Sequence, residues 1–211
     1  MRVLVLCSGT GSIDRAFERK GWDVVSVDWL AKFRPTLCVD IMGWDYRTAF
    51  PKDYFQFVWA SPACTQFSIA RTTRKPRDLE GANALVQRCL EIAEYFGCEW
   101  CLENPATGLL KHQPLMQGLA WTDTCYCKYG FDYRKATRLW HSRRFGEHFR
   151  PQPLCCAASP CPAAAANGVH PTRASYTHRG RHAYSQEQLY CMPPSLCDEI
   201  AEAADVVAAR P

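Results

Sequence analysis

Residues 2–29 read RVLVLCSGTGSIDRAFERKGWDVVSVDW, and this stretch decides the fold. Residues 2–7 have the pattern of a strand that is buried on both faces of a parallel sheet. A Ser-Gly-Thr-Gly turn follows and opens a helix, which Ser12 is predicted to cap. A second strand rich in β-branched residues, 23–27, closes with Asp28. A strand, a crossover helix and a parallel strand form a βαβ unit, so we predict an α/β fold with a doubly wound, mostly parallel sheet.

The rest of the chain continues the alternation of strands and helices. Apolar runs predict further strands at residues 37–41, 54–60, 100–102, 120–128 and 137–142. Residues 78–96 place apolar side chains at helical spacing, so an amphipathic helix is expected before the strand at 100–102. From residue 149 onward the composition shifts to Pro, Ala, Cys and Gly, which indicates an insert with little core. A closing helix is predicted over residues 195–209, behind a Pro-Pro pair.

Composition limits the class of protein. The chain has 211 residues, 47% of them apolar and 22% charged, as expected for one globular domain with a small appendage. No apolar run reaches the length of a membrane span, and the first residues lack the apolar core of a signal peptide. We therefore expect the 13 cysteines to be thiols in a reducing, intracellular compartment, the cytoplasm or the nucleus. The net charge is only +4, so any affinity for nucleic acid must come from local patches.

The stretch FVWASPACTQFS, residues 57–68, presents a cysteine for chemistry. Its apolar strand ends before Pro62, which cannot donate a hydrogen bond within a sheet. Cys64 is therefore expected on a loop at the carboxyl end of the strand, the edge where open α/β sheets bind ligands. A thiol there is well placed for nucleophilic attack, and the basic residues 71–77 are expected to lower its pKa. Most of the other cysteines are expected to be small core residues.

A carboxyl group is expected beside this thiol. Glu103 and Asn104 also follow a predicted strand, which comes one crossover helix after the strand that leads to Cys64. Consecutive parallel strands joined by one helix usually lie side by side. The thiol and the carboxyl group should then converge at one edge of the sheet.

A nucleoside-containing cofactor is expected at the first βα turn, with an ordinary turn as the alternative. The glycines allow the backbone to approach a ligand at the helix amino terminus, and Asp28 can accept hydrogen bonds from a ribose. Trp29 offers a face for an adenine, and Asp40 an acceptor for its amino group. The turn lacks the Gly-Lys-Ser/Thr pattern of nucleoside triphosphate sites. The expected site comprises Cys7, Ser8, Gly9, Thr10, Gly11, Ser12, Asp28, Trp29, Asp40, Ile41 and Ser61.

Several motifs together resemble the cytosine-5 DNA methyltransferase family. They are, in chain order, CSGTGS, VDW, SPACTQFS, LENP and the late MPPSL. The compact form, with YGFDYRKATRLW and a short cysteine-rich insert, is similar to the small methyltransferases of phages and large DNA viruses. The resemblance implies a Rossmann-like fold that uses S-adenosylmethionine. It also implies a catalytic core at residues 1–141, a short target-recognition insert at 142–188 and a segment at 189–211 that completes the catalytic domain.

The resemblance also implies a mechanism. Cys64 would add to carbon 6 of a cytosine flipped out of the duplex, so that carbon 5 can accept the methyl group. Glu103 would donate to ring nitrogen 3, Asn104 would support the loop, and either Arg134 or Arg138 would assist at the ring oxygen. There are two alternatives to this function. The protein could perform the same chemistry on RNA, or it could be a catalytically silent protein that binds nucleic acid or the cofactor. The short insert predicts a short or loosely specified target sequence.

Two further sets of residues suggest partners. We expect the protein to be a monomer that binds DNA and does not associate with membranes. Basic residues near the predicted site are expected to contact the phosphates of the DNA. These residues are Arg71, Arg74, Lys75, Arg77, Arg143 and Arg144. The cysteines and histidines of the insert suggest a zinc site, because thiolate and imidazole ligands suit this metal. The spacing of the cysteines is irregular, and free thiols are the alternative. The candidate ligands are Cys155, Cys156 and Cys161, with His170 or His178 and with Cys125 or Cys127.

Overall fold

A computed structural model describes residues 1–69, 71, 75–164, 169–170 and 184–209 of the chain. The strands are β1 (Arg2–Leu6), β2 (Asp23–Asp28), β3 (Leu37–Cys38), β4 (Phe57–Ala60), β5 (Glu99–Pro105), β6 (Ala120–Cys125) and β7 (Ala136–His141). The α-helices are α1 (Ser12–Arg19), α2 (Tyr46–Ala49), α3 (Leu79–Phe96), α4 (Arg143–His148), α5 (Gln186–Tyr190) and α6 (Pro194–Ala208). Short 3₁₀-helices are η1 (Ala31–Phe33), η2 (Lys52–Tyr54), η3 (Leu110–His112), η4 (Pro114–Met116) and η5 (Tyr126–Tyr129).

The strands form one seven-stranded sheet in the order β3-β2-β1-β4-β5-β7-β6. The strands from β3 to β5 are parallel, whereas β7 runs antiparallel to both β5 and β6. The prediction of a doubly wound, mostly parallel sheet is therefore confirmed. The strand order reverses between β1 and β4, so the carboxyl ends of these two strands define the switch point where such sheets bind ligands.

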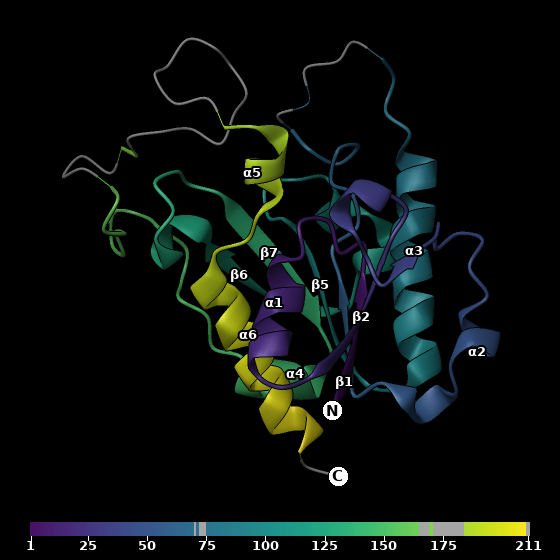
Figure 1. Ribbon diagram of the computed structural model, residues 1–211. Helices are drawn as coiled ribbons and strands as arrows, with labels where there is room; N and C mark the ends of the chain where they lie inside the picture. The colour runs from purple at the N-terminus through teal and green to yellow at the C-terminus, as the bar shows by residue number, and fades with distance from the viewer. Residues whose placement is uncertain (70, 72–74, 165–168, 171–183, 210–211) are drawn as a thin grey trace.

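Helices cover both faces of the sheet (Figure 1). Alternate residues of β1 point to opposite faces, as a strand requires. Val3 and Val5 pack in the core beneath α1 and α6, whereas Leu4 and Leu6 pack in the core beneath α3. All four side chains are fully buried, which explains why β1 reads as a continuous apolar run and not as an alternating one.

The amphipathic helix predicted at residues 78–96 is confirmed as α3. The Asp78 side chain caps it by accepting a hydrogen bond from the Gly81 backbone N–H at 2.8 Å. Gly97 ends it with a φ of 62°, a left-handed conformation that glycine adopts at little cost. The crossover through α3 brings β5 directly beside β4, as the sequence predicts.

Several predicted boundaries are wrong. β3 spans only two residues, and η2 occupies the start of the strand expected at 54–60. The strand expected at 120–128 ends at Cys125, where η5 begins. β5 extends through Pro105, so Glu103 and Asn104 lie within a strand and not after it. The helices α4 and α5 were not predicted, because each is too short to show a helical period.

The predicted capping of α1 by Ser12 is also wrong. Gly11 is the capping residue and has no side chain to offer, while Ser12 is already helical. The Ser12 hydroxyl instead accepts a hydrogen bond from the Met192 backbone N–H at 3.2 Å. It therefore fixes the segment that leads into α6 against the first turn of α1.

None of the helices in the described part of the chain combines the length and apolar character that crossing a membrane requires.

Candidate active site

The predicted nucleophile loop, residues 61–68, leaves β4 at the carboxyl edge of the sheet. Cys64 opens a tight turn, in which its carbonyl accepts hydrogen bonds from the backbone N–H groups of Phe67 at 3.0 Å and Ser68 at 2.8 Å. The Phe67 side chain is fully buried and anchors the turn in the core beneath α3. The Cys64 thiol is partly exposed at this turn.

Two side chains from outside the loop hold it in place. The Asn104 amide on β5 donates to the Pro62 carbonyl at 2.9 Å, and this contact is fully buried. Arg77 donates to the carbonyls of Gln66 and, at 2.9 Å, of Ser68. The loop is therefore fixed on both sides of Cys64, and Arg77 is engaged in positioning it.

Glu103 lies at the same edge, held by two hydroxyl groups. It is 9% exposed, and its Oε1 accepts hydrogen bonds from the Thr137 hydroxyl and, at 3.3 Å, from the Tyr126 hydroxyl. Thr137 lies opposite Pro105 in the β5–β7 register, so its side chain shares the face of the sheet with Glu103. Burial raises the pKa of Tyr126 well above its usual range, so this phenol stays a hydrogen-bond donor.

The electrostatics of Cys64 link it to this carboxyl group. Burial is the largest cause that raises the pKa of the thiol, and the charge of Glu103 raises it further. The positive charge of Lys135 lowers the pKa in opposition. The expectation that residues 71–77 lower the Cys64 pKa below its usual value is wrong, because this pKa is raised. Desolvation of the thiol and the charge of Glu103 outweigh the opposing charge of Lys135.

The first βα turn lies next to this loop at the switch point. Ser61 donates its backbone N–H to the Leu6 carbonyl at 3.1 Å, and its hydroxyl accepts from the Trp59 indole at 2.7 Å. Cys7, Gly9 and Gly11 all have positive φ, at 54°, 52° and 68°. The backbone thus leaves β1 in a sharp turn directly beside the loop that carries Cys64.

Asp28 organises the turn from the end of β2. Its two carboxylate oxygens accept hydrogen bonds from the backbone N–H groups of Gly9 and Leu30, each at 2.9 Å. A carboxylate has about four acceptor positions, so both oxygens can still accept from a ligand. Trp29, which follows Asp28, leaves 71% of its surface exposed.

The other residues expected at the cofactor are also placed. The Thr10 and Ser12 hydroxyls lie 3.2 Å apart at the start of α1, and the Ser8 backbone N–H donates to Val27 at 3.2 Å. Asp40 is exposed and accepts from the Met42 backbone N–H at 3.0 Å, while Ile41 is buried in the core beneath α3.

The chain was compared with known proteins. No family model matches it. It is 32% identical to a protein of Frog virus 3 (isolate Goorha) named as a probable DNA (cytosine-5)-methyltransferase, over 96% of this chain and 99% of that one. The chain belongs to the cytosine-5 DNA methyltransferase family.

Solved structures support the fold of this methyltransferase. A prophage-encoded protein of Escherichia coli, assigned as a DNA modification methyltransferase, superposes with a TM-score of 0.51 and 16% identity, over 74% of this chain. The Entamoeba histolytica methyltransferase EhMeth superposes with a TM-score of 0.51 and 12% identity, over 67% of this chain. The chain spans about half the length of these solved proteins, 52% in each case.

The two arginines predicted to assist the methyltransferase reaction make their described hydrogen bonds with groups other than Glu103. Arg138 binds both carboxylate oxygens of Asp123, at 2.7 and 2.8 Å, with its guanidinium 3.6 Å from the Trp121 ring centroid. It pairs with Asn104 in the register, so its side chain points to the face opposite Glu103. Arg134 is exposed and donates to the Cys155 carbonyl at 3.3 Å.

Lys135 is the cation that the sequence analysis missed. Its Nζ donates to the Leu189 carbonyl at 2.9 Å and lies 4.5 Å from the centroid of the Tyr126 ring. Tyr126 in turn donates to Glu103, so the ammonium group lies on the side of the sheet where the thiol and carboxyl group converge. Its signal in the sequence was its place in the basic pair Arg134-Lys135, directly before β7.

The basic residues fall into two groups at opposite edges. Arg71 donates to the Pro76 carbonyl at 3.0 Å and Lys75 is exposed, both near the nucleophile loop, whereas Arg74 lies outside the described residues. Arg143 and Arg144 lie on α4, near the chain termini and away from that edge (Figure 1). Arg144 donates to the Val207 carbonyl at 3.0 Å. The structure thus corrects the assignment of Arg143 and Arg144 to the DNA surface around Cys64, because β7 carries the chain to the other end of the sheet.

The predicted metal ligands also need correction. Ligand atoms of Cys127, Cys155, Cys161 and His170 all lie within 4.8 Å of one another. Cys156 is exposed and lies outside this group, because its neighbour Cys155 points inward. His178, the alternative to His170, lies outside the described residues.

Proposed function

We propose that this methyltransferase transfers a methyl group from S-adenosylmethionine to carbon 5 of a cytosine in DNA, through a covalent adduct of Cys64. The observation that carries the proposal is the convergence of the Cys64 thiol and the Glu103 carboxyl group at the end of adjacent parallel strands. The contact of Asn104 with Pro62 supports it, because it ties the strand of the acid to the loop of the nucleophile. The name of the Frog virus 3 relative supports cytosine and DNA as the target.

The residues at the switch point fit S-adenosylmethionine. Asp28 keeps acceptor positions for the ribose hydroxyls, and the exposed indole of Trp29 offers a stacking face for the adenine. The glycine turn after β1 allows the backbone to approach the rest of the cofactor. When bound, this cofactor supplies an electrophilic methyl group.

The protein residues then perform the remaining steps. The Cys64 thiol releases its proton to solvent, and the nearby charge of Lys135 favours the thiolate. The thiolate bonds to carbon 6, and the electron pair of the ring double bond makes carbon 5 nucleophilic. After methylation, a base removes the carbon 5 proton, and the electron pair of that carbon–hydrogen bond re-forms the double bond between carbons 5 and 6. The thiolate leaves carbon 6 with the electron pair of the carbon–sulfur bond.

Glu103 is proposed to take up a proton from solvent and to donate it to ring nitrogen 3 as negative charge develops there. The hydroxyls of Tyr126 and Thr137 both bind Oε1, which fixes the carboxyl plane and assigns Oε2 to the base. None of this chemistry is accessible within a stacked duplex, so the cytosine must be flipped out.

DNA that contains 5-fluorocytosine tests the proposal, because fluorine cannot leave as the carbon 5 proton does and the adduct is trapped. We expect wild-type protein with S-adenosylmethionine to form a denaturation-resistant complex, and Cys64→Ser to form none. Cys98→Ser, a change to another partly buried thiol, is the matched control and should still form the complex.

Two results would contradict the proposal. Equal trapping by wild type and Cys64→Ser would exclude Cys64 as the nucleophile. Trapping on 5-fluorocytosine tRNA in preference to DNA would assign the same chemistry to RNA. Random-sequence DNA in the same assay also measures the predicted short or loose target, since a long strict consensus would refute that prediction.

A further inference from the structure

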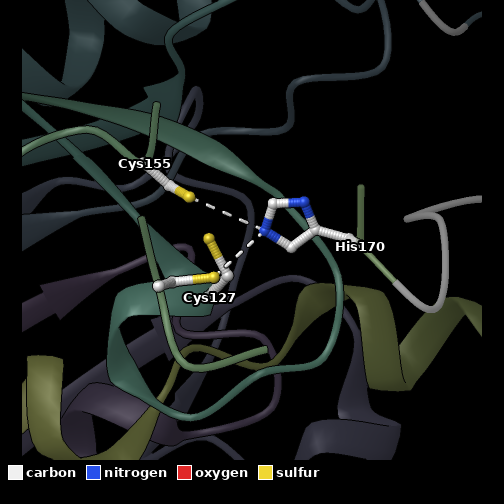
Figure 2. A group of neighbouring side chains, drawn as sticks. Cys127, Cys155 and His170 are labelled. Atoms are coloured by element: carbon white, nitrogen blue, oxygen red, sulfur yellow. Dashed lines mark hydrogen bonds between the residues drawn. The ribbon is translucent and has the colours of Figure 1, made fainter. Parts of the chain in front are cut away.

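Four side chains from distant parts of the chain converge beside η5. Cys127 lies on η5, Cys155 and Cys161 lie in the insert after α4, and His170 follows them. The His170 Nε2 lies 3.2 Å from the Cys161 Sγ and 3.8 Å from the Cys155 Sγ. Figure 2 shows the sulfur atom of Cys155 directed towards the imidazole ring of His170, with Cys127 close to both. We call these four residues the Cys3His group.

The spacing matches a tetrahedral zinc site. Zinc binds thiolate sulfur at about 2.3 Å and imidazole nitrogen at about 2.0 Å. At those lengths and a tetrahedral angle, a sulfur and a nitrogen ligand lie about 3.5 Å apart. This value falls between the two observed sulfur–nitrogen distances of 3.2 and 3.8 Å. All four donor atoms lie within 4.8 Å of one another, close enough for them to converge on one ion.

We propose that the Cys3His group binds one structural zinc ion. Three sulfurs and one nitrogen complete a closed tetrahedral shell, which leaves no position for a substrate or a reactive water. On binding, three Zn–S bonds and one Zn–N bond form, and each protonated thiol releases its proton to solvent. No change of oxidation state is involved.

Apolar packing alone does not account for this cluster. Among the described residues, the hydrophobic cluster around the Cys3His group has only cysteines as its buried members, and only small or partly buried apolar residues pack against them. These cysteines are Cys125, which is not one of the four candidate ligands, and Cys127, Cys155 and Cys161. Such side chains bury little apolar surface, so they contribute little to holding the insert. A metal ion supplies the missing folding energy, as in other small metal-stabilised segments.

Cations around the group suit its charge. Zinc with three thiolates and a neutral histidine carries a net charge of about −1. Arg134 donates to the Cys155 carbonyl at 3.3 Å and lines the same surface hollow as His170. Lys128, next to Cys127, donates to Ser159 and to the Pro160 carbonyl at 2.8 and 2.9 Å. These contacts favour the anionic complex and orient its ligands.

The ion would connect the insert to the proposed active site. Cys127 is adjacent to Tyr126, which donates to Glu103. Fixing η5 through Cys127 therefore fixes one of the two hydroxyls that orient the acid. The insert is thereby held next to the strand that carries Thr137, the other hydroxyl donor.

Metal analysis of the purified chain tests the site. We expect about one zinc per chain in the wild type, and cobalt(II) reloaded after chelation should give the absorption of a tetrahedral thiolate complex. Cys161→Ser should lower zinc affinity at least about tenfold, because even residues that only orient ligands contribute about 10- to 100-fold. Cys156→Ser is the matched control, since this exposed thiol neighbours a ligand but lies outside the group.

The outcomes decide the proposal without any measurement of methylation. Wild-type protein that binds neither zinc nor cobalt(II) after refolding with the metal would overturn it. Equal loss of metal in Cys156→Ser and Cys161→Ser would overturn the ligand assignment. The cobalt spectrum of the wild type needs no variant, so a variant that fails to fold leaves the test intact.

Discussion

Asp14 allows the physical account of the fold to be tested by pH. It lies in the first turn of α1, and its Oδ1 is buried without a hydrogen-bond partner in the described part of the chain. Burial is the largest cause that raises the pKa of its carboxyl group, from 3.8 to about 6. The folded protein therefore favours the protonated form more than the unfolded chain does.

The sign and size of the effect follow from that difference. A raised carboxyl pKa contributes stability below pH 4 that is lost as pH rises to about 6. A pKa of about 6 instead of 3.8 corresponds to at most about 3 kcal/mol of lost stability above pH 6. Asp14→Asn removes the charge, so it should raise the free energy of unfolding at pH 8 by about 1 to 3 kcal/mol.

Urea unfolding of both proteins between pH 4 and pH 8 measures the effect. The difference in stability between Asp14→Asn and wild type should grow from pH 4 to pH 6 and then level off. Asp45→Asn is a control of opposite sign, because hydrogen bonds from Thr48 lower the pKa of the exposed Asp45. A constant difference between Asp14→Asn and wild type across this range would refute the reasoning.

Two further variants test the proposed active site. Asn104→Ala leaves the buried Pro62 carbonyl without its hydrogen-bond donor. It should lower the free energy of unfolding, measured in urea, by about 1 to 3 kcal/mol. An unchanged midpoint of the urea transition would show that the contact is not formed. Lys135→Met should shift alkylation of Cys64, followed by mass spectrometry, to higher pH, because it removes the charge that lowers this pKa. Lys135→Arg keeps the charge and should keep the wild-type profile, so equal shifts in both variants would contradict the electrostatic role.

Local sequence determined the scaffold of the site. The buried run of β1, the glycine turn and the acidic end of β2 form one βαβ unit, whose contacts are mostly close in sequence. The loop after β4 is equally local, because Pro62 ends the strand and Cys64 follows. One crossover helix then suffices to predict that β5 lies beside β4.

Tertiary structure decided which side chains meet. The pleat of β7 directs the Arg138 side chain to Asp123 on one face of the sheet. The antiparallel register places Thr137 beside Glu103 on the other face. Those positions depend on β7 reversing direction beside β5, which no local pattern encodes. Desolvation likewise made the Cys64 pKa rise although basic residues are near in sequence.

The Cys3His group shows the same division. The cysteine-rich composition of residues 149–161 was visible in the sequence, and so was the preference of such ligands for zinc. The selection of Cys127 over Cys125 and the exclusion of Cys156 were not, because they depend on η5 folding back against the insert and on Cys155, not its neighbour, pointing inward. Sequence determined the types of residue, the βαβ unit and the pairing of β4 with β5, whereas long-range packing and solvent exclusion determined the partners of each reactive group.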